Sequence, residues 1–378
     1  MANQVGNFFT NIARSLVSGS DSVVGIDIGS SAIKIVQLKN VRGQAVLKTY
    51  GELSVGPYAT LAIGQIANLP SEKLVEIIRD LFREAGVNTK NAEFAIPHRA
   101  SLFVPMEIPK LSEDKLADVI NIEARKYVPV PISEVSLDWW QIPDRENKAE
   151  ASAGAPKQGI TGRSEMINIM MVAIHKDVID QYQQIASTLG LQTGFIEIET
   201  FSALRSTIRD TRKPAVIVDL GAATTKMVIV DEGIVRLSHT INKGAQDITQ
   251  AIATSMSIDF AKAEEIKRQV GLVERVGGDS LHAVISPTVE YIFSEVSRVM
   301  IDYQKRQAVS IDKIFLVGGG SQLRGLVDIV KNKVYADVVI GTPFDRVSSL
   351  PFLNDVLKEI GPSFAVAIGL ALRGLEEN

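Results

Sequence analysis

The chain contains no cysteine and only four histidines among its 378 residues. The absence of cysteine excludes disulfides, thiolate catalysis and cysteine-ligated metal centres. No two histidines lie close together in the sequence, so a histidine-based zinc site is not expected. No apolar run approaches membrane-spanning length and no signal peptide is recognisable, so we expect a cytoplasmic protein.

The chain also lacks a large excess of charge of either sign, because its formal net charge is only −4. No long block of lysine and arginine occurs. Nucleic-acid binding therefore has no electrostatic basis in this sequence. Hydrophobic residues make up 46% of the chain and charged residues 22%, which is typical of a globular protein. A chain of this length can bury a large core, and we expect two lobes or several subdomains.

The most informative feature is a pattern that occurs twice. Residues 24–37 (VGIDIGSSAIKIVQ) and 218–230 (VDLGAATTKMVIV) each run from apolar residues to an Asp, a Gly, small residues and a Lys. Because β-branched residues flank a glycine turn, each copy predicts a strand, a tight turn and a returning strand. The spacing from Asp to Lys is the same in both copies, Asp27 to Lys34 and Asp219 to Lys226.

Two such hairpins that face each other could bind a nucleotide polyphosphate from both sides. The glycine turns let successive N–H groups converge on an anion, and small hydroxyl side chains add donors. The carboxylates would repel bare phosphate, so we expect a magnesium ion between them. Either copy alone favours a plain β-hairpin, and only the matched pair favours phosphate binding. The residues concerned are Gly29, Ser30, Ser31, Gly221, Thr224 and Thr225 for phosphate, and Asp27 and Asp219 for magnesium.

Hydrophobic periodicity predicts the remaining organisation. A hairpin, a strand, a helix and a further strand make half of an α/β lobe, an insert follows, and a second lobe begins near residue 213. The N-terminal residues 6–17 are either a short amphipathic helix or part of a disordered tail, and 144–165 is expected to be a flexible loop. Expected strands are 45–55, 91–97, 101–108, 135–142, 166–174, 192–198, 234–240 and 313–317; expected helices are 71–85, 112–127, 176–189, 245–257, 259–270, 287–308 and 362–374.

Two further stretches suit a nucleotide site. The triple glycine in FLVGGGSQLRGL follows a buried strand, where the backbone can approach a base or ribose, and a helix is expected to begin near Ser321. Glu264 and Lys267 are three residues apart on one helical face. That pair is either a solvated salt bridge or a pair of groups that holds ribose hydroxyls and an adenine edge.

Taken in order, the two hairpins, AEEIK, VGGGSQLRGL and SFAVAIGLALR resemble the actin-like ATPase superfamily. The resemblance implies an α/β fold of two lobes, each built from duplicated mixed-sheet subdomains, that binds ATP or ADP with Mg²⁺. It implies magnesium coordination, mostly through water, by Asp27 and Asp219. The implied nucleotide contacts are Gly29, Ser30, Ser31, Lys34, Gly221, Ala222, Thr224 and Thr225 at the phosphates, Gly244 near the ribose, and Glu264, Lys267, Gly318, Gly319 and Gly320 at the adenosine.

The insert narrows the resemblance to the branch that contains the cell-division protein FtsA. The opening VGIDIGSSAIKIVQL and the run IPKLSEDKLADVINIEARKYVPVPISEVSLDWW resemble the PilM family of type IV pilus assembly proteins, over residues 21–375. The subdomains that this implies are an N-terminal extension (1–20), a first-lobe part (21–99), the FtsA/PilM-type insert (100–196), a return to the first lobe (197–212), the second lobe (213–361) and a C-terminal helix that packs back on the first lobe (362–378).

The PilM resemblance implies a cytoplasmic ATP-binding scaffold that binds the cytoplasmic N-terminal tail of a PilN-like inner-membrane protein. Membrane association would then be indirect, with other pilus assembly proteins and further copies of the chain as additional partners. The tail would lie in a groove between the first lobe and the insert, by strand addition or in an extended form. These residues are either groove candidates or simply core residues: Val104, Met106, Ile108, Ile120 and Ala124.

Catalysis is predicted to be slow at most. In IEIETFSALRS, Glu199 either orients water toward the terminal phosphate or caps the helix that follows. Thr200 and Ser202 replace the Pro and Ala of stronger hydrolases, which the resemblance associates with weak turnover. An FtsA-like, membrane-associated, filament-forming ATPase is the alternative function. A sugar-kinase-like phosphotransferase is less favoured, because no Asp is placed as its base.

Overall fold

The computed structural model describes residues 21–143, 166–273, 275–276 and 279–377. The expected N-terminal helix and the expected loop at 144–165 lie outside these residues. The chain divides into two compact units: Arg99–Asp180, called unit 1 here, and the described residues 21–98 with 181–377, called unit 2. The subdomain boundaries expected from the sequence stay a prediction.

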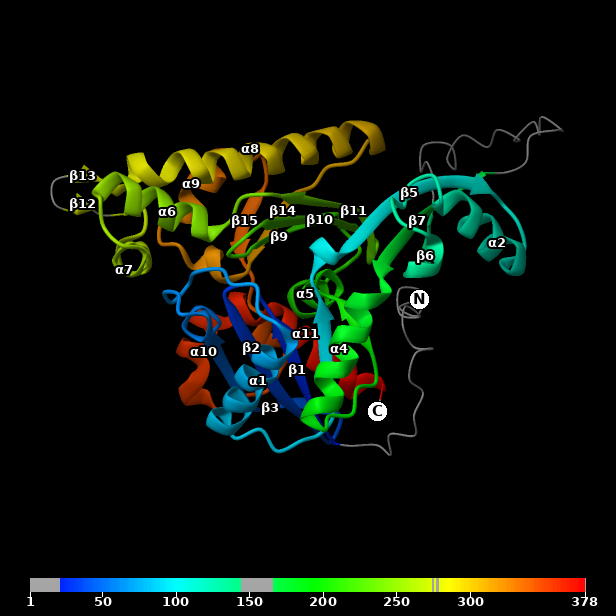
Figure 1. Cartoon of the computed structure of the whole chain (residues 1–378). Coiled ribbons are helices and arrows are strands. Elements are labelled where there is room, and N and C mark those ends of the chain that lie inside the picture. The colour runs from blue at the N-terminus through cyan, green and yellow to red at the C-terminus, as the bar shows by residue number, and fades with distance from the viewer. Residues whose placement is uncertain (1–20, 144–165, 274, 277–278, 378) are drawn as a thin grey trace. The chain divides into compact units, whose positions relative to one another are not determined.

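Unit 2 is built on two five-stranded sheets of the same topology (Figure 1). In each sheet a three-stranded antiparallel meander is followed by two strands parallel to the first, and the sequence repeat corresponds to the hairpin of each meander. The first sheet has the order β3 (Gln44–Ser54), β2 (Ala32–Val41), β1 (Ser22–Ile28), β4 (Ala92–Ile96) and β8 (Ile196–Ile198). The second has the order β11 (Ile234–Ile241), β10 (Thr225–Asp231), β9 (Ala215–Leu220), β14 (Lys313–Val317) and β15 (Asp337–Ile340).

Helices cover both sheets, and their apolar faces form the cores. Helix α1 (Ser71–Ala85) ends at Gly86 in the left-handed conformation and buries four aliphatic side chains against the first sheet, as its spacing predicts. None of the helices among the described residues has the length and apolarity needed to traverse a bilayer. The others are α4 (Lys176–Leu189), α5 (Glu199–Thr207), α6 (Ala245–Met256), α7 (Phe260–Val270), α8 (Leu281–Gln307), α9 (Leu326–Lys331), α10 (Asn354–Ile360) and α11 (Ala365–Glu377), with a two-stranded ribbon of β12 (Arg275–Val276) and β13 (Asp279–Ser280).

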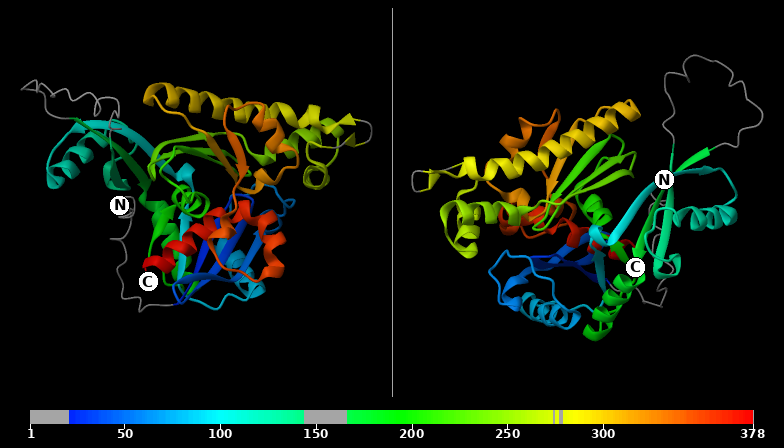
Figure 2. Two further views of the ribbon diagram at one scale, coloured as in Figure 1. Left: turned by 180° about the vertical axis from the view of Figure 1, so that it is seen from behind. Right: turned by 45° about the horizontal axis from the view of Figure 1, so that its top comes forward.

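The final helix, α11, packs on the first sheet and on α5, and Figure 2 shows it in red against the blue strands. Small residues allow this close approach, as the sequence SFAVAIGLALR predicts. A Cβ on Gly369 would overlap the carbonyl oxygen of Ser202 in α5, and one on Gly25 would overlap the carbonyl oxygen of Ala367. Because backbone atoms form these contacts, no side-chain rotation can relieve the overlap.

We expect Gly369→Ala to lower the free energy of unfolding by about 1–3 kcal/mol, because the added methyl group must push α11 away from α5. Urea unfolding followed by circular dichroism measures the change. Gly361→Ala is the matched control, since a Cβ there would lie 3.5 Å from the Phe344 ring, an ordinary contact. Equal stability of the two variants would contradict the packing argument.

Unit 1 is a three-stranded antiparallel sheet of order β5 (Ser101–Pro109), β7 (Met166–His175) and β6 (Val135–Ile142), with helix α2 (Glu113–Ala124) on one face. The expected strands are confirmed, and α2 ends three residues earlier than the predicted 112–127. Trp140 makes an edge-to-face contact with Phe103 on β5, with ring centroids 6.4 Å apart.

The residues proposed as groove candidates are buried in the core of unit 1. Alternation along β5 places Val104, Met106 and Ile108 on the face beneath α2, where each is at most 7% exposed. Ile120 and Ala124 come from α2 and pack onto the same cluster. These side chains therefore form the core of unit 1 rather than the wall of a groove. Their periodicity correctly showed a buried face, but it did not show that a helix of the same unit covers that face.

Candidate functional site

The Asp and the Lys that are equally spaced in the two hairpins occupy equivalent positions in the structure. In the β1–β2 ladder Asp27 is directly opposite Lys34, and in the β9–β10 ladder Asp219 is directly opposite Lys226. Directly opposed residues project from the same face of a sheet. Each turn therefore presents one carboxylate and one ammonium group side by side, as the repeat predicts.

The first turn is closed by a hydrogen bond from the Gly29 N–H to the Ala32 carbonyl oxygen, 3.0 Å. The carbonyl groups of Ser30 and Ser31 accept hydrogen bonds from residues that follow β3, so this loop is anchored on the turn. Both serine side chains are partly exposed. They remain available as donors to an anion, which is the role that the sequence predicts for them.

The second turn is closed in the same way, from the Gly221 N–H to the Thr224 carbonyl, 3.1 Å. Its outward carbonyl groups accept hydrogen bonds from the first amides of α6, Ala245 to Gly221 at 2.9 Å and Gln246 to Ala222 at 3.0 Å. A Cβ on Gly244 would overlap the carbonyl of Ala222. Gly244 is therefore required for α6 to approach the turn, a packing role additional to its predicted position near a ribose.

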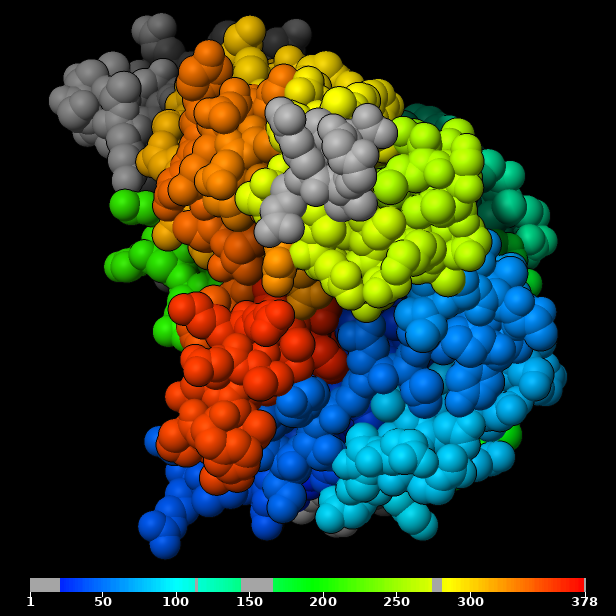
Figure 3. Space-filling view, turned by 90° about the vertical axis from the view of Figure 1, so that its left-hand side faces the viewer, coloured from blue at the N-terminus to red at the C-terminus, as the bar shows by residue number. Residues whose placement is uncertain are grey.

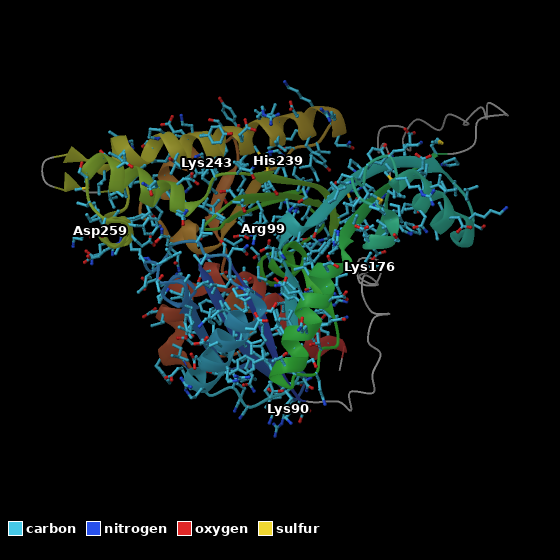
Figure 4. The ribbon with its side chains drawn as sticks, in the orientation of Figure 1. Lys90, Arg99, Lys176, His239, Lys243 and Asp259 are labelled. Carbon is cyan, nitrogen blue, oxygen red and sulfur yellow. The ribbon has the colours of Figure 1, made fainter. Side chains whose placement is uncertain are left out.

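Thr225 differs from its expected role. Its side chain is fully buried, and its hydroxyl donates to the carbonyl oxygen of Lys243 at 2.8 Å; Lys243 is labelled in Figure 4. A hydroxyl engaged in this way stabilises the segment between β11 and α6. Its hydroxyl therefore supports the loop, and the predicted phosphate contact of Thr225 stays a prediction.

The triple glycine has three different environments. Gly318 has a φ of +83°, and a Cβ there would overlap the Asp219 carboxylate. Gly320 is buried against the Leu220 side chain, whereas Gly319 is exposed with no atom within 4 Å of a Cβ position. Only Gly319 thus presents an open backbone surface that a ligand could approach.

The helix expected to begin near Ser321 is not present. Gly319–Gln322 forms a single 3-10 turn, and the next helix is the short α9, which begins at Leu326. The hydroxyl of Ser321 donates to the Gly318 carbonyl at 2.7 Å and tightens the turn. A 3-10 turn forms here because the Gly318 conformation reverses the chain immediately after β14.

At the centre of the site, the charges of three carboxylates, Asp27, Asp219 and Glu199, act together with that of Lys226. Lys226 Nζ lies 3.1 Å from Asp219 Oδ2 and 2.8 Å from Oε2 of Glu199, the first residue of α5. Burial would lower the pKa of Lys226, but the carboxylates of Asp219 and Glu199 outweigh it and raise that pKa. Burial raises the pKa of Asp27 to about 7, with Lys34 opposing the shift and Glu199 adding to it. Lys226 is therefore firmly charged, whereas burial makes Asp27 a weaker acid than an exposed aspartate.

His98 forms a second link between the two sheets of unit 2. It follows β4, and its ring nitrogens contact the hydroxyls of Ser238 and Thr240 on β11. Its backbone N–H donates to Glu199 Oε1 at 2.5 Å. Burial, assisted by the charge of Lys226, lowers the pKa of His98 to about 4, so the ring is neutral near pH 7.

The donor set suits a cation that is held mainly through water. Among the described residues no group of three or more Asp, Glu or His side chains is arranged to hold a metal ion directly. The two hairpin carboxylates, Asp27 and Asp219, belong to one charge cluster with Lys226. This arrangement fits Mg²⁺, which keeps several waters and bridges carboxylates to phosphates, better than it fits Ca²⁺, which takes six to eight oxygen ligands directly.

The predicted adenosine pair forms a buried ion pair. Lys267 Nζ lies 2.6 Å from Glu264 Oε2, on helix α7, which begins after the capping residue Asp259 labelled in Figure 4. The Glu264 carboxylate also accepts from Thr249 at 2.6 Å and from Arg268 at 2.7 Å. Burial favours the neutral form of Glu264, but Lys267 outweighs it and lowers the Glu264 pKa. The two side chains thus form a salt bridge, but a buried one rather than the solvated one considered from the sequence, and the adenosine role stays a prediction.

The loop that follows β3 approaches the pair formed by Glu264 and Lys267. The Ile66 N–H donates to Gln246 Oε1 on α6 at 2.7 Å, and a Cβ on Gly64 would lie 2.8 Å from the Glu264 carboxylate. Figure 3 shows the yellow-green surface of α6 and α7 against the blue segment that follows β3. The lobes of unit 2 are therefore linked at the predicted adenosine end and at Glu199.

Sequence reasoning missed Lys226 and His98 as site residues. Lys226 was visible as part of the repeat, but its partner Glu199 is distant in the sequence and belongs to the other lobe. His98 lacks a local motif; the only available signal was a histidine placed directly after a strand end. Both residues act through contacts that only the folded arrangement of two sheets creates.

The chain was compared with protein families and with solved structures. The family model described as type IV pilus assembly protein PilM matches residues 25–375. Among solved structures, the PilM–PilN type IV pilus biogenesis complex is similar with a TM-score of 0.77 and 26% identity, covering 95% of this chain and 99% of that chain.

Two more distant relatives support the same fold. The cell division protein FtsA of Pseudomonas aeruginosa is 22% identical, covering 96% of this chain and 91% of its own length. MreB 5 of Spiroplasma citri, solved with AMPPNP bound, has a TM-score of 0.50 at 12% identity, covering 96% of this chain and 98% of that chain. The actin-like α/β fold with duplicated mixed sheets, expected from the sequence, is confirmed.

Proposed function

The chain belongs to the type IV pilus assembly protein PilM family, and on this premise we propose that it is a nucleotide-binding scaffold of pilus assembly. The observation that carries the proposal is the family match over nearly the whole chain, together with the likeness to the PilM–PilN complex. Its role would be to bind ATP or ADP and to hold a partner, with turnover slow at most.

The hairpins support nucleotide binding. Gly29, Ser30, Ser31 and Lys34 from one turn and Gly221, Ala222 and Thr224 from the other would hold the phosphates, with Gly319 as the open backbone approach near the adenosine. Asp27 and Asp219 would hold a magnesium ion through water, and the ion would neutralise phosphate charge. A cation bound at Asp27 would favour the charged carboxylate and so offset the burial that raises its pKa to about 7.

The proposed partner is the cytoplasmic N-terminal tail of a PilN-like inner-membrane protein, which would place the chain at the inner membrane through that partner. Among the described residues of unit 1, β5 and β6 are the edge strands to which a further strand could be added. Strand β5 contains Pro105 and Pro109, which lack an N–H group, whereas β6 contains no proline. Strand β6 therefore supports main-chain pairing with an extended peptide better than β5 does.

A synthetic peptide of the PilN-like tail is expected to bind with a dissociation constant in the micromolar range. This corresponds to a binding free energy of about −8 kcal/mol. Both tryptophans, Trp139 and Trp140, lie on β6, so their fluorescence should change when the peptide pairs there. Calorimetry gives the affinity, and fluorescence titration shows whether the peptide binds at β6. A scrambled peptide of the same composition is the control, and absence of both heat and fluorescence change would contradict the proposed partner.

The likeness to FtsA supports a common ancestry of the two-hairpin fold and does not outweigh the family match. The FtsA proteins of Pseudomonas aeruginosa and Staphylococcus epidermidis are 22% and 24% identical to this chain, whereas the PilM model spans residues 25–375. A filament-forming or sugar-kinase function therefore has less support than the scaffold.

A further inference from the structure

The lysine of the second hairpin links carboxylates of two different lobes. Lys226 belongs to β10, and its ammonium group contacts Asp219 on β9 and Glu199 at the start of α5. All three side chains are at most 16% exposed. Ion pairs withdrawn from water to this extent hold their partners in place more firmly than surface pairs do.

The equivalent lysine of the first hairpin behaves differently. Lys34 is opposite Asp27 in the ladder, yet its Nζ is paired at 3.8 Å with Glu52 on the neighbouring strand β3. Glu52 is well exposed, with a side-chain exposure of 40%. The repeat therefore places two lysines alike, and only the second reaches across to the other lobe.

Both oxygens of Glu199 are occupied in this arrangement. Oε1 accepts the His98 N–H at 2.5 Å, and Oε2 accepts Lys226 at 2.8 Å. A carboxylate that orients an attacking water needs an oxygen directed at that water. Glu199 is the candidate for that role in this chain, and each of its oxygens already accepts a hydrogen bond, one from His98 and one from Lys226.

We propose that Lys226 is a positioning residue that restrains hydrolysis by holding Glu199 against Asp219 and away from the attacking water. The proposal rests on the proposed nucleotide binding. In the restrained reaction the water oxygen bonds to the terminal phosphorus, the bond from that phosphorus to the bridging oxygen breaks, ADP leaves, and the water proton passes to Glu199 and then to phosphate. With Glu199 tied to Lys226, the chain retains ATP as a structural ligand.

The test replaces Lys226 with Met, which keeps the length of the side chain and removes its charge. At saturating ATP and Mg²⁺, single-turnover hydrolysis by Lys226→Met should be about 100-fold faster than by the unmodified protein, because Glu199 becomes free to orient water. Lys226→Arg should keep the slow rate, since a guanidinium can hold the same two carboxylates. The double variant Lys226→Met with Glu199→Gln should lose the gain.

A second measurement needs no turnover. Without nucleotide, Lys226→Met leaves Asp219 and Glu199 without their shared cation, so MgCl₂ alone should raise its melting temperature by several degrees more than that of the unmodified protein. Lys333→Met removes a lysine paired with Glu290 at 3.0 Å and is the matched control for loss of one ion pair. It should show neither the faster hydrolysis nor the Mg²⁺ effect.

The outcomes separate the two proposals. Calorimetry with ATP on the unmodified protein tests the proposed nucleotide binding. If no ATP binds, both the proposed nucleotide binding and the proposed role of Lys226 in slowing hydrolysis are wrong. If ATP binds and Lys226→Met hydrolyses it no faster, the restraint alone is overturned. Lys226→Gln provides a second neutral variant should the Met variant unfold, and the same two readings apply to it.

Discussion

Replacing Asp219 with alanine is expected to abolish nucleotide retention while leaving a folded protein. The carboxylate contacts Lys226 at 3.1 Å, lies against Gly318 of the triple-glycine loop, and is the predicted magnesium ligand of the second hairpin. Its loss leaves Lys226 with Glu199 alone and removes half of the proposed cation site. Truncating one member of a buried charge pair costs about 2–5 kcal/mol, which corresponds to a loss of affinity of about 30-fold or more.

The measurement is calorimetry with ATP and Mg²⁺, together with the nucleotide content of the purified protein after denaturation. Circular dichroism checks that Asp219→Ala is folded. Asp210→Ala is the control, because Asp210 pairs only locally with Arg212 at the surface and lies outside the cluster. Normal ATP binding by Asp219→Ala would show that the two-hairpin model is wrong.

Local patterns predicted the parts of this site that one segment forms by itself. The spacing of Asp27 and Lys34 fixed a cross-strand pair because a tight turn allows only one register for those two positions. Helix α1 followed directly from its apolar stripe. The duplicated sheets followed from the second copy of the same hairpin pattern, since a similar sequence forms a similar meander.

Contacts between distant segments could not be predicted in this way. The Glu199–Lys226 pair joins two lobes, and no local pattern relates residues that far apart. The buried alternation on β5 identified an apolar face correctly but not its cover, which is α2 of the same unit. Gly318 and Gly320 were predicted as ligand contacts, which stays a prediction, but no local pattern showed that Asp219 and Leu220 also require them to be small.

The largest loss of stability is expected from Glu197, which is 2% exposed and holds the first lobe to its C-terminal helix. Its carboxylate accepts hydrogen bonds from Arg205 at 2.6 and 3.0 Å and from Arg373, on α11, at 2.8 Å. Ser202 donates to it at 2.5 Å, and the Arg373 guanidinium lies 4.0 Å from the centroid of the Phe195 ring. Burial would raise the pKa of Glu197, but Arg205, with Arg373, outweighs it and lowers that pKa.

Glu197→Gln keeps the shape of the side chain and leaves two arginines without their shared counter-charge. Because a buried ion that loses its partner retains its desolvation penalty, we expect a loss of about 3–5 kcal/mol in the free energy of unfolding at pH 7. Since the folded-state pKa of Glu197 lies below the unfolded value, its contribution is present above the unfolded pKa and is lost as the pH falls below it. The difference between the two proteins should therefore shrink in acid.

Urea unfolding at pH 7 and at pH 4 measures both effects, and limited proteolysis reports whether α11 detaches first. Glu265→Gln is the control, since Glu265 pairs with Lys262 at 2.7 Å on the exposed face of α7 and should change stability by less than about 1 kcal/mol. Adding Arg373→Met to Glu197→Gln should recover part of the loss, because it removes one of the uncompensated charges. A loss below about 1 kcal/mol in Glu197→Gln would mean that apolar contacts of α11, rather than this ion network, hold the helix in place.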